Sequence, residues 1–269
     1  MDVQSVPMTT KRIGRAFRFL KETGSTNRDM DAAGAAGAPE GLLIAADAQT
    51  AGCGRMTRGW FSPPGVNLYF SLLLRPDVAP YCAVSLPLVI GLAVAEGLAE
   101  CEPSLQPQIK WPNDIYVNGK KICGILCEMQ LAGDAINYLI AGVGVNVNIL
   151  AAQLPPELRA SATSVAIEIG QSASRETVLA SILNRFEPLY DQWRAFGFTA
   201  LVQQVNLFDM LRDMPIRMEL SGTPIEGTAC GIRRDGALLL RTTDGLMPVY
   251  SGEAHIVGYG QRLRHTAQS

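Results

Sequence analysis

The chain has 269 residues, 48% of them hydrophobic and 18% charged, with a net charge of −2. This balance predicts a soluble globular protein of one large and one small domain, and it argues against a bulk nucleic-acid binder. The six cysteines form no CxxC pair, and the two histidines, His255 and His265, lie near the C-terminus. We therefore expect reduced thiols in a cytoplasmic protein and no metal site made by the protein alone.

The first third of the chain predicts strands separated by a helix and a loop. Apolar runs typical of buried strands cover residues 17–22, 41–47 and 67–75. Ser25 or Thr26 can cap a helix that continues to about Ala36. Residues 49–65 are rich in glycine and predict a loop. The N-terminal tail, residues 1–16, has no apolar core of the kind that a signal peptide needs.

Residues 82–98 are apolar over a length close to that of a membrane span. Ser85 as an N-cap, with Pro87 near the first turn, is instead a typical helix start in a soluble domain. We expect a largely buried core helix, no membrane partner and a cytoplasmic location.

The middle of the chain contains a hairpin and a long helix. Residues 115–122 carry Asn118-Gly119 between two apolar runs, the strongest short-range hairpin signal. Residues 136–147 are a candidate for a further pair of strands. Residues 176–196 place apolar side chains at helical spacing and predict an amphipathic helix.

The pattern changes after about residue 214, where five short β segments are separated by glycine-containing turns. This spacing predicts a small barrel or curled sheet. The expected fold class is therefore α+β, a mixed sheet flanked by helices followed by a small C-terminal β domain. The expected boundaries are 17–213 for the main domain, 214–262 for the small domain and 263–269 for a tail.

Lys110 lies where a strand must stop, because Trp111-Pro112 and Asn113-Asp114 supply extended and then turn geometry. A lysine held beside an indole suits an anionic ligand or a developing phosphate charge. The alternative is an ordinary strand exit.

The loop Gln49–Trp60 combines three glycines with Arg55 and Arg58. The glycines allow close approach of the backbone, and the arginines can pair with a carboxylate or phosphate. The spacing fits neither a Walker loop nor the dinucleotide fingerprint. The alternative is a flexible surface loop with solvated arginines.

Five ordered motifs, spread over about residues 19–257, make the chain resemble biotin protein ligases. They are Ser25-Thr26-Asn27, Gln49-x-x-Gly52-x-Gly54-Arg55, Lys110-Trp111-Pro112-Asn113-Asp114, Lys121-Ile122-x-Gly124-Ile125-Leu126 and Gly142-Val143-Gly144-Val145-Asn146. The resemblance implies a class II synthetase-like catalytic domain and an SH3-like C-terminal barrel. It also implies the monofunctional form, because about 16 residues before the first strand are too few for the DNA-binding domain that some relatives carry.

The resemblance implies a site residue by residue. Lys110 and Arg55 are the expected catalytic cations. The expected biotin ligands are Ser25, Thr26, Asn27, Gln49, Gly52, Cys53, Gly54, Arg55 and Lys110, and the expected ATP and adenylate contacts are Arg58, Trp60, Asn113 and Asn146. Simpler interpretations stay open: helix capping for Ser25-Thr26-Asn27, a turn residue for Asn146, packing for Trp60 and Trp111, and a hairpin-edge charge for Lys121.

The implied reaction has two steps. Biotin and ATP form biotinyl-5′-AMP and pyrophosphate with Mg²⁺ bound mainly through the phosphates, and a lysine of a biotin carboxyl carrier protein then takes the biotinyl group. Cys53, Met56 and Thr57 stand where the family often has Arg, Arg and Gly, and Val257 where it often has Arg. A lipoate ligase or octanoyl transferase, and a non-catalytic biotin-binding module, remain alternatives. The oligomeric state is expected to be a monomer or a homodimer.

Overall fold

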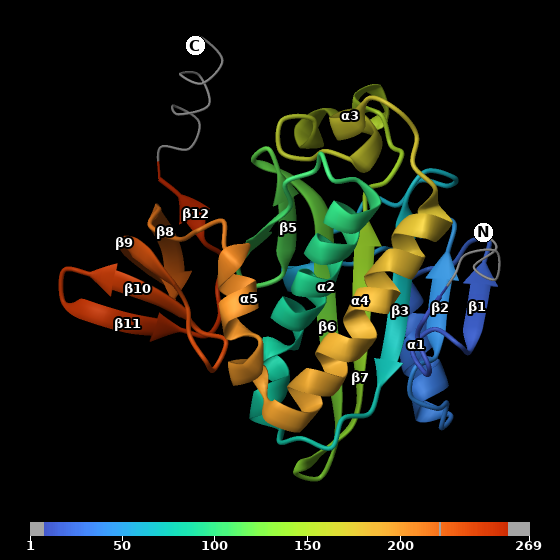
Figure 1. The fold of residues 1–269 in the computed structure, drawn as a ribbon, viewed down its shortest axis with the longest axis horizontal. Coiled ribbons are helices and arrows are strands. Elements are labelled where there is room, and N and C mark those ends of the chain that lie inside the picture. The colour runs from blue at the N-terminus through green and yellow to red at the C-terminus, as the bar shows by residue number, and fades with distance from the viewer. Residues whose placement is uncertain (1–7, 221, 258–269) are drawn as a thin grey trace.

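A seven-stranded mixed sheet forms the centre of the protein (Figure 1), which we describe over residues 8–220 and 222–257 of a computed structural model. The strand order is β1-β2-β3-β7-β6-β5-β4, with β1 and β2 parallel and all other neighbours antiparallel. The strands are β1 (Phe17–Leu20), β2 (Leu43–Ala46), β3 (Leu68–Leu74), β4 (Gln108–Lys110), β5 (Asp114–Val117), β6 (Lys120–Ala132) and β7 (Ala135–Val145). The predicted mixed sheet is confirmed.

Helices cover both faces of this sheet. Figure 1 shows α2 (Leu86–Cys101) and α4 (Arg175–Phe196) side by side in front of the sheet and α1 (Thr26–Ala35) behind it. Two further helices, α3 (Val165–Ile169) and α5 (Val202–Leu207), are short. Short 3-10 segments are η2 (Arg55–Thr57), η3 (Pro80–Ser85), η4 (Ala151–Gln153), η5 (Pro156–Leu158) and η6 (Phe198–Ala200).

The apolar helix α2 is a core helix, as its sequence predicts. The helical stretch Pro80–Cys101 is long and apolar enough to cross a membrane by length and composition, yet 72% of its most apolar window is buried inside the protein. It packs mainly against α4. Mutual burial of the two helices explains why a run of apolar residues without a polar face is compatible with this fold.

The C-terminal domain is a separate five-stranded antiparallel sheet of order β11-β10-β9-β8-β12. Its strands are β8 (Pro215–Leu220), β9 (Thr223–Ile232), β10 (Leu238–Thr242), β11 (Gly245–Val249) and β12 (His255–Ile256). These agree with the five predicted β segments. The predicted boundary at residue 262 and the tail 263–269 lie outside the described residues.

One element differs from its prediction. Residues 136–147 contribute to a single strand, β7, and not to a pair. Gly142 and Gly144 adopt no left-handed backbone geometry, so no turn interrupts the run. Antiparallel neighbours β3 and β6 hold β7 along both edges. The predicted hairpin at Asn118-Gly119 is confirmed, and both turn residues have positive φ, 49° and 75°.

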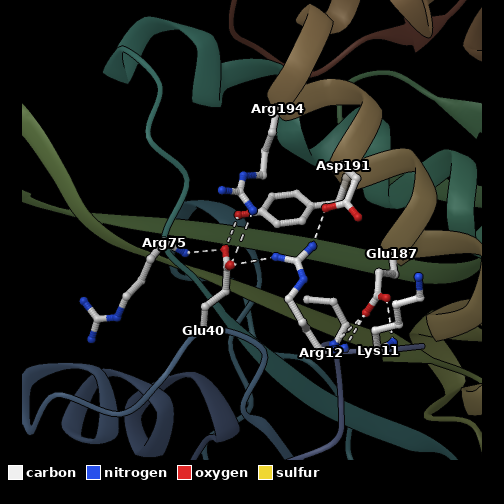
Figure 2. A network of polar contacts seen from close by, with 9 residues as sticks. Lys11, Arg12, Glu40, Arg75, Glu187, Asp191 and Arg194 are labelled. Carbon is white, nitrogen blue, oxygen red and sulfur yellow. Dashed lines mark hydrogen bonds and ion pairs between the residues drawn. The ribbon is translucent and has the colours of Figure 1, made fainter.

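A half-buried carboxylate, Glu40, and a buried one, Glu187, tie the N-terminal segment to α4, as Figure 2 shows. Glu40 accepts hydrogen bonds from Arg12 at 2.9 Å and from the Tyr190 hydroxyl at 2.8 Å. Glu187 accepts from the backbone N–H groups of Lys11 at 2.6 Å and Ile13 at 2.8 Å. Burial alone would raise the pKa of Glu187, but these backbone donors and that of Arg12 lower it overall. The network anchors the chain before β1.

Candidate functional site

One pocket brings together every predicted site residue except Gly52. It lies on the face of the sheet that α1 only partly covers, beneath the loop between β2 and β3. The predicted residues that line it are Ser25, Thr26, Asn27, Gln49, Cys53, Gly54, Arg55, Arg58, Trp60, Lys110, Asn113 and Asn146. Gly52 instead closes the loop, because a Cβ there would lie 2.8 Å from both Ser62 Oγ and the Trp60 carbonyl.

Glycines create the depth of the pocket. Gly124 pairs with Gly144 across β6 and β7, and Gly142 pairs with Ser71 on β3, so all three glycines lie on the pocket face. A Cβ on Gly142 would lie 2.1 Å from Asn27 Oδ1, and a Cβ on Gly144 would lie 2.4 Å from Trp60 Nε1. Any side chain at these two positions would therefore collide with the walls of the pocket.

The end of the pocket next to α1 is polar and shielded from water. Ser25, Thr26, Asn27 and Ser71 are all buried there. Ser25 occupies the N-cap position of α1, but its hydroxyl makes no capping hydrogen bond. The helix-capping interpretation therefore accounts for the position of Ser25 and not for its side chain. Buried hydroxyl and amide groups of this kind can recognise a compact polar ring by paired hydrogen bonds.

Lys110 projects into the other end of the pocket from the last position of β4, as predicted. Its ammonium lies 3.5 Å from the Tyr116 hydroxyl and 5.2 Å from the centre of that ring. Burial lowers the pKa of Lys110, although the carboxylates of Asp114 and Glu253 oppose this effect. The next residue, Trp111, is joined to Pro112 by a cis peptide bond. Its indole N–H donates to the Gly236 carbonyl at 3.0 Å. Trp111 thus connects the two domains.

The glycine loop is held at both ends and is not a free surface loop. Within it, Gly54 N–H donates to the Arg58 carbonyl at 2.7 Å and Trp60 N–H to the Gly52 carbonyl at 2.8 Å. Arg55 donates to Asn113 Oδ1 at 3.1 Å. The turn between these contacts places Met56 and Thr57 at φ of 53° and 58°, a region that side chains other than glycine rarely adopt.

The C-terminal domain completes the site, which sequence patterns did not reveal. Arg58 forms an ion pair with Glu253 at 2.7 Å, and Arg55 donates to the Gly252 carbonyl at 3.3 Å. The hydrogen bond from Arg58 lowers the pKa of Glu253. Glu253 also lines the pocket. No local motif in the C-terminal strands marks this residue as part of a site, since only the packing of the two domains brings it there.

Lys121 is a further candidate for a functional residue. The hairpin pattern predicted its strand but not the position of its side chain. Its ammonium lies 2.7 Å from Asp114 Oδ1 and 5.5 Å from the centre of the Trp60 ring, within the pocket. It does not lie on an exposed edge, because β5 pairs on one side and Ala162 bridges to it on the other. Asn146 also lines the pocket, and its amide donates to the Thr163 carbonyl at 2.9 Å.

Among the described residues that line the pocket, four are cations and two are carboxylates: Lys110, Lys121, Arg55 and Arg58 against Asp114 and Glu253. This charge surplus can hold a polyphosphate and a carboxylate close together despite their mutual repulsion. No group of three or more His, Cys, Asp or Glu side chains that could hold a metal ion occurs among the described residues. A cation accompanying a polyphosphate would depend mainly on phosphate oxygens.

Comparison with known proteins identifies both domains. Residues 17–146 match the biotin/lipoate A/B protein ligase family, and residues 214–256 match the biotin protein ligase C-terminal domain. The bifunctional ligase/repressor BirA of Bacillus spizizenii is 36% identical over 93% of this chain and 76% of its own length. The biotin–[acetyl-CoA-carboxylase] ligase of Mycobacterium tuberculosis is 32% identical, over 89% of this chain and 88% of its own.

Solved structures agree. The biotin protein ligase from Aquifex aeolicus in complex with biotin and ATP has a TM-score of 0.77 and 31% identity, over 90% of this chain and 98% of its own. The biotin protein ligase from Leishmania major in complex with biotinyl-5-AMP has a TM-score of 0.58 and 26% identity, over 90% of this chain and 98% of its own. Similarity in sequence, in fold and in both domains places this chain in the biotin protein ligase family.

Proposed function

We propose that this chain catalyses the ATP-dependent ligation of biotin to a lysine of a biotin carboxyl carrier protein through biotinyl-5′-AMP. The observation that carries the proposal is the division of the pocket into a buried, neutral polar end and a cationic end. A ligand with a compact polar ring at one end and a carboxylate at the other fits this division. The conversion of that carboxylate into an acyl phosphate is what converging cations promote.

In the proposed first step, a biotin carboxylate oxygen attacks the α-phosphorus of ATP and pyrophosphate leaves. Lys110 and Arg55 bring the two anions together and stabilise the charge that develops on the phosphate oxygens. Mg²⁺, held through the phosphates, would neutralise further charge. Arg58, Trp60, Asn113 and Asn146 would contact the nucleotide. The described residues offer no acceptor to the buried indole N–H of Trp60, so an oxygen of the ligand could accept from it.

Biotin would lie with its ureido ring against Ser25, Thr26, Asn27 and Gln49 and its valeryl chain over the glycines. The loop residues Cys53 and Gly54 line the path toward the carboxylate. Because the loop is tied to the C-terminal domain, the reactive anhydride would form in a pocket with restricted access to water.

In the proposed second step, the amine of the carrier lysine attacks the biotinyl carbonyl and AMP leaves. The carrier could dock on the open edge of β6. Lys120–Gly124 pair with β5, but in the described part of the chain the residues of β6 beyond Ile125 pair only with β7. This unpaired backbone lies beside the pocket and can accept an additional strand.

We further propose a cytoplasmic monomer or homodimer that acts without nucleic acid or membrane. The decisive experiment measures pyrophosphate release with ATP and Mg²⁺ in the presence of biotin or lipoate. Biotin-dependent release supports the proposal. Release with lipoate alone would assign the chain to the lipoate branch, and biotin binding without pyrophosphate from either acid would indicate a non-catalytic binding module.

A further inference from the structure

A line of side-chain hydrogen bonds crosses the polar end of the pocket and reaches a residue outside it, Glu128 on β6. The Asn27 amide donates to a Glu128 carboxylate oxygen at 2.6 Å. Ser71 Oγ lies 2.6 Å from Asn27 Oδ1 and 2.8 Å from Thr26 Oγ1. Glu128 is exposed, whereas the other three side chains are buried. One surface carboxylate is thus in contact with the buried polar floor.

The line continues from Thr26 to the glycine loop. Gln49 Oε1 accepts from the Thr26 backbone N–H at 3.0 Å, and Gln49 Nε2 donates to Ser62 Oγ at 3.0 Å. The Ser62 hydroxyl donates to the Trp60 carbonyl at 3.0 Å. The same line of hydrogen bonds therefore ends at Trp60, whose indole lies over Gly144.

The carboxylate at one end fixes the direction of these hydrogen bonds. Ionised Glu128 can only accept, so Asn27 must present its NH₂ group to it and turn Oδ1 toward Ser71. Ser71 Oγ lies within donating distance of both Asn27 Oδ1 and Thr26 Oγ1 but has a single proton. When Asn27 Oδ1 takes that proton, the Ser71–Thr26 hydrogen bond requires the Thr26 proton, which Gln49 Oε1 at 3.3 Å otherwise accepts. Glu128 is the nearer of two acceptors for this amide, because the Leu126 carbonyl lies at 3.4 Å. A glutamine at position 128 would weaken the constraint, because its amide can both donate and accept.

Strand register explains why Glu128 can reach Asn27. Glu128 pairs with Ile140 on β7, two positions along from the Leu126–Gly142 pair, so its side chain lies on the pocket face. Gly142 has no side chain, and Asn27 occupies the space that a Cβ there would fill. The missing side chain at Gly142 thus leaves room for Asn27 between Ser71 on β3 and Glu128 on β6.

We propose that Glu128 is a positioning residue for recognition of the biotin ureido group, which it does not contact. It fixes the orientation of the Asn27 amide and, through Ser71, of the Thr26 hydroxyl, and so sets which donors and acceptors the pocket presents. This inference rests on the proposed function, since it requires the ureido ring to bind at this end. A urea has one hydrogen-bond acceptor and two donors. If the donors and acceptors of the pocket exchanged places, they would no longer match those of the urea.

The test compares Glu128→Gln, Glu128→Ala and the control Met129→Ala, which truncates an adjacent, partly exposed side chain of β6 outside the pocket. Biotin affinity is measured by titration calorimetry, the KM for ATP from pyrophosphate release, and Tm by thermal unfolding. We expect the biotin Kd to rise about 10-fold in both Glu128 variants, the scale of one lost charge-assisted hydrogen bond. The KM for ATP and the Tm should stay at wild-type values, and Met129→Ala should resemble the wild type.

A double variant separates action through Asn27 from a general structural effect. If Glu128 acts through Asn27, then Glu128→Ala should add no further loss of biotin affinity to Asn27→Ala. An unchanged biotin Kd in both Glu128 variants, an additive loss in the double variant, or an equal rise in the KM for ATP would each overturn the inference. Wild-type protein that binds no biotin would instead refute the proposed function.

Discussion

Replacing Lys110 by alanine should lower biotin-dependent pyrophosphate release at least about 100-fold, which corresponds to about 2.7 kcal/mol of transition-state stabilisation. The magnitude follows from the place of its ammonium, partly buried at the cationic end of the pocket and held 5.2 Å from the Tyr116 ring centre. A unit charge about 4 Å from an anionic oxygen contributes about 4 kcal/mol at an effective dielectric of about 20. Lys121 and Arg55 would retain part of the field, which reduces the loss.

The assay is steady-state pyrophosphate release at saturating biotin, with Lys120→Ala as the matched control. Lys120 lies in the adjoining hairpin and pairs with Val117, but it does not line the pocket. A loss of less than about fivefold in Lys110→Ala, with a normal Tm, would refute the electrostatic argument.

The pH profile gives a second readout of the same argument. Because burial lowers the pKa of Lys110, activity should fall on the alkaline side below the ordinary lysine value of about 10.4, as the ammonium loses its proton. Lys110→Arg, which keeps its charge over this range, should show a lower rate but no such fall from position 110. An alkaline limb identical in both proteins would assign the titration to another group.

Three further changes probe the pocket, the loop and the N-terminal anchor. Gly142→Ala should abolish measurable biotin binding by calorimetry, because its Cβ would displace Asn27. Thr57→Gly should relieve the strain of a β-branched residue at φ 58° and raise the Tm, and a lowered Tm would contradict this. Glu187→Gln should cost about 2 kcal/mol in denaturant titrations at pH 7. Because the pKa of Glu187 is lowered in the folded protein, its contribution should be present at neutral pH and decline as the pH falls below about 4.3, so the variant and the wild type should converge in acid.

Most of the fold could be predicted because its signals are local. The Asn118-Gly119 turn, the apolar run of β3 and the helical spacing of α4 each reflect backbone preferences over a few residues. Residues 136–147 were mispredicted because two glycines in a strand have the same local signature as a turn. Their actual role, to leave space for Asn27 and Trp60, depends on residues more than 80 positions away in the sequence.

Site residues could be predicted from the sequence only where they stand together in a short motif. Lys110, Arg55 and the Ser25-Thr26-Asn27 segment stand in motifs, and the structure brings them to one pocket, although their roles toward biotin and ATP stay predictions. Glu253 and Glu128 stand in no motif singled out from the sequence. Each reaches the site through tertiary structure, Glu253 through domain packing and Glu128 through the register of β6 against β7.

The two carboxylates missed by sequence reasoning act on opposite ends of the same pocket. Glu253 holds Arg58 and so the cationic loop, whereas Glu128 holds Asn27 and so the neutral polar floor. Neither belongs to the set of cations and hydroxyls expected to touch biotin or ATP. The two carboxylates thus orient a guanidinium in one case and an amide in the other, Glu253 from within the pocket lining and Glu128 from outside it. Because Glu128 contacts only the polar end of the pocket, its substitution should alter biotin affinity before it alters the chemical step, whereas substitution of Glu253 should alter both, since its carboxylate also acts on Lys110.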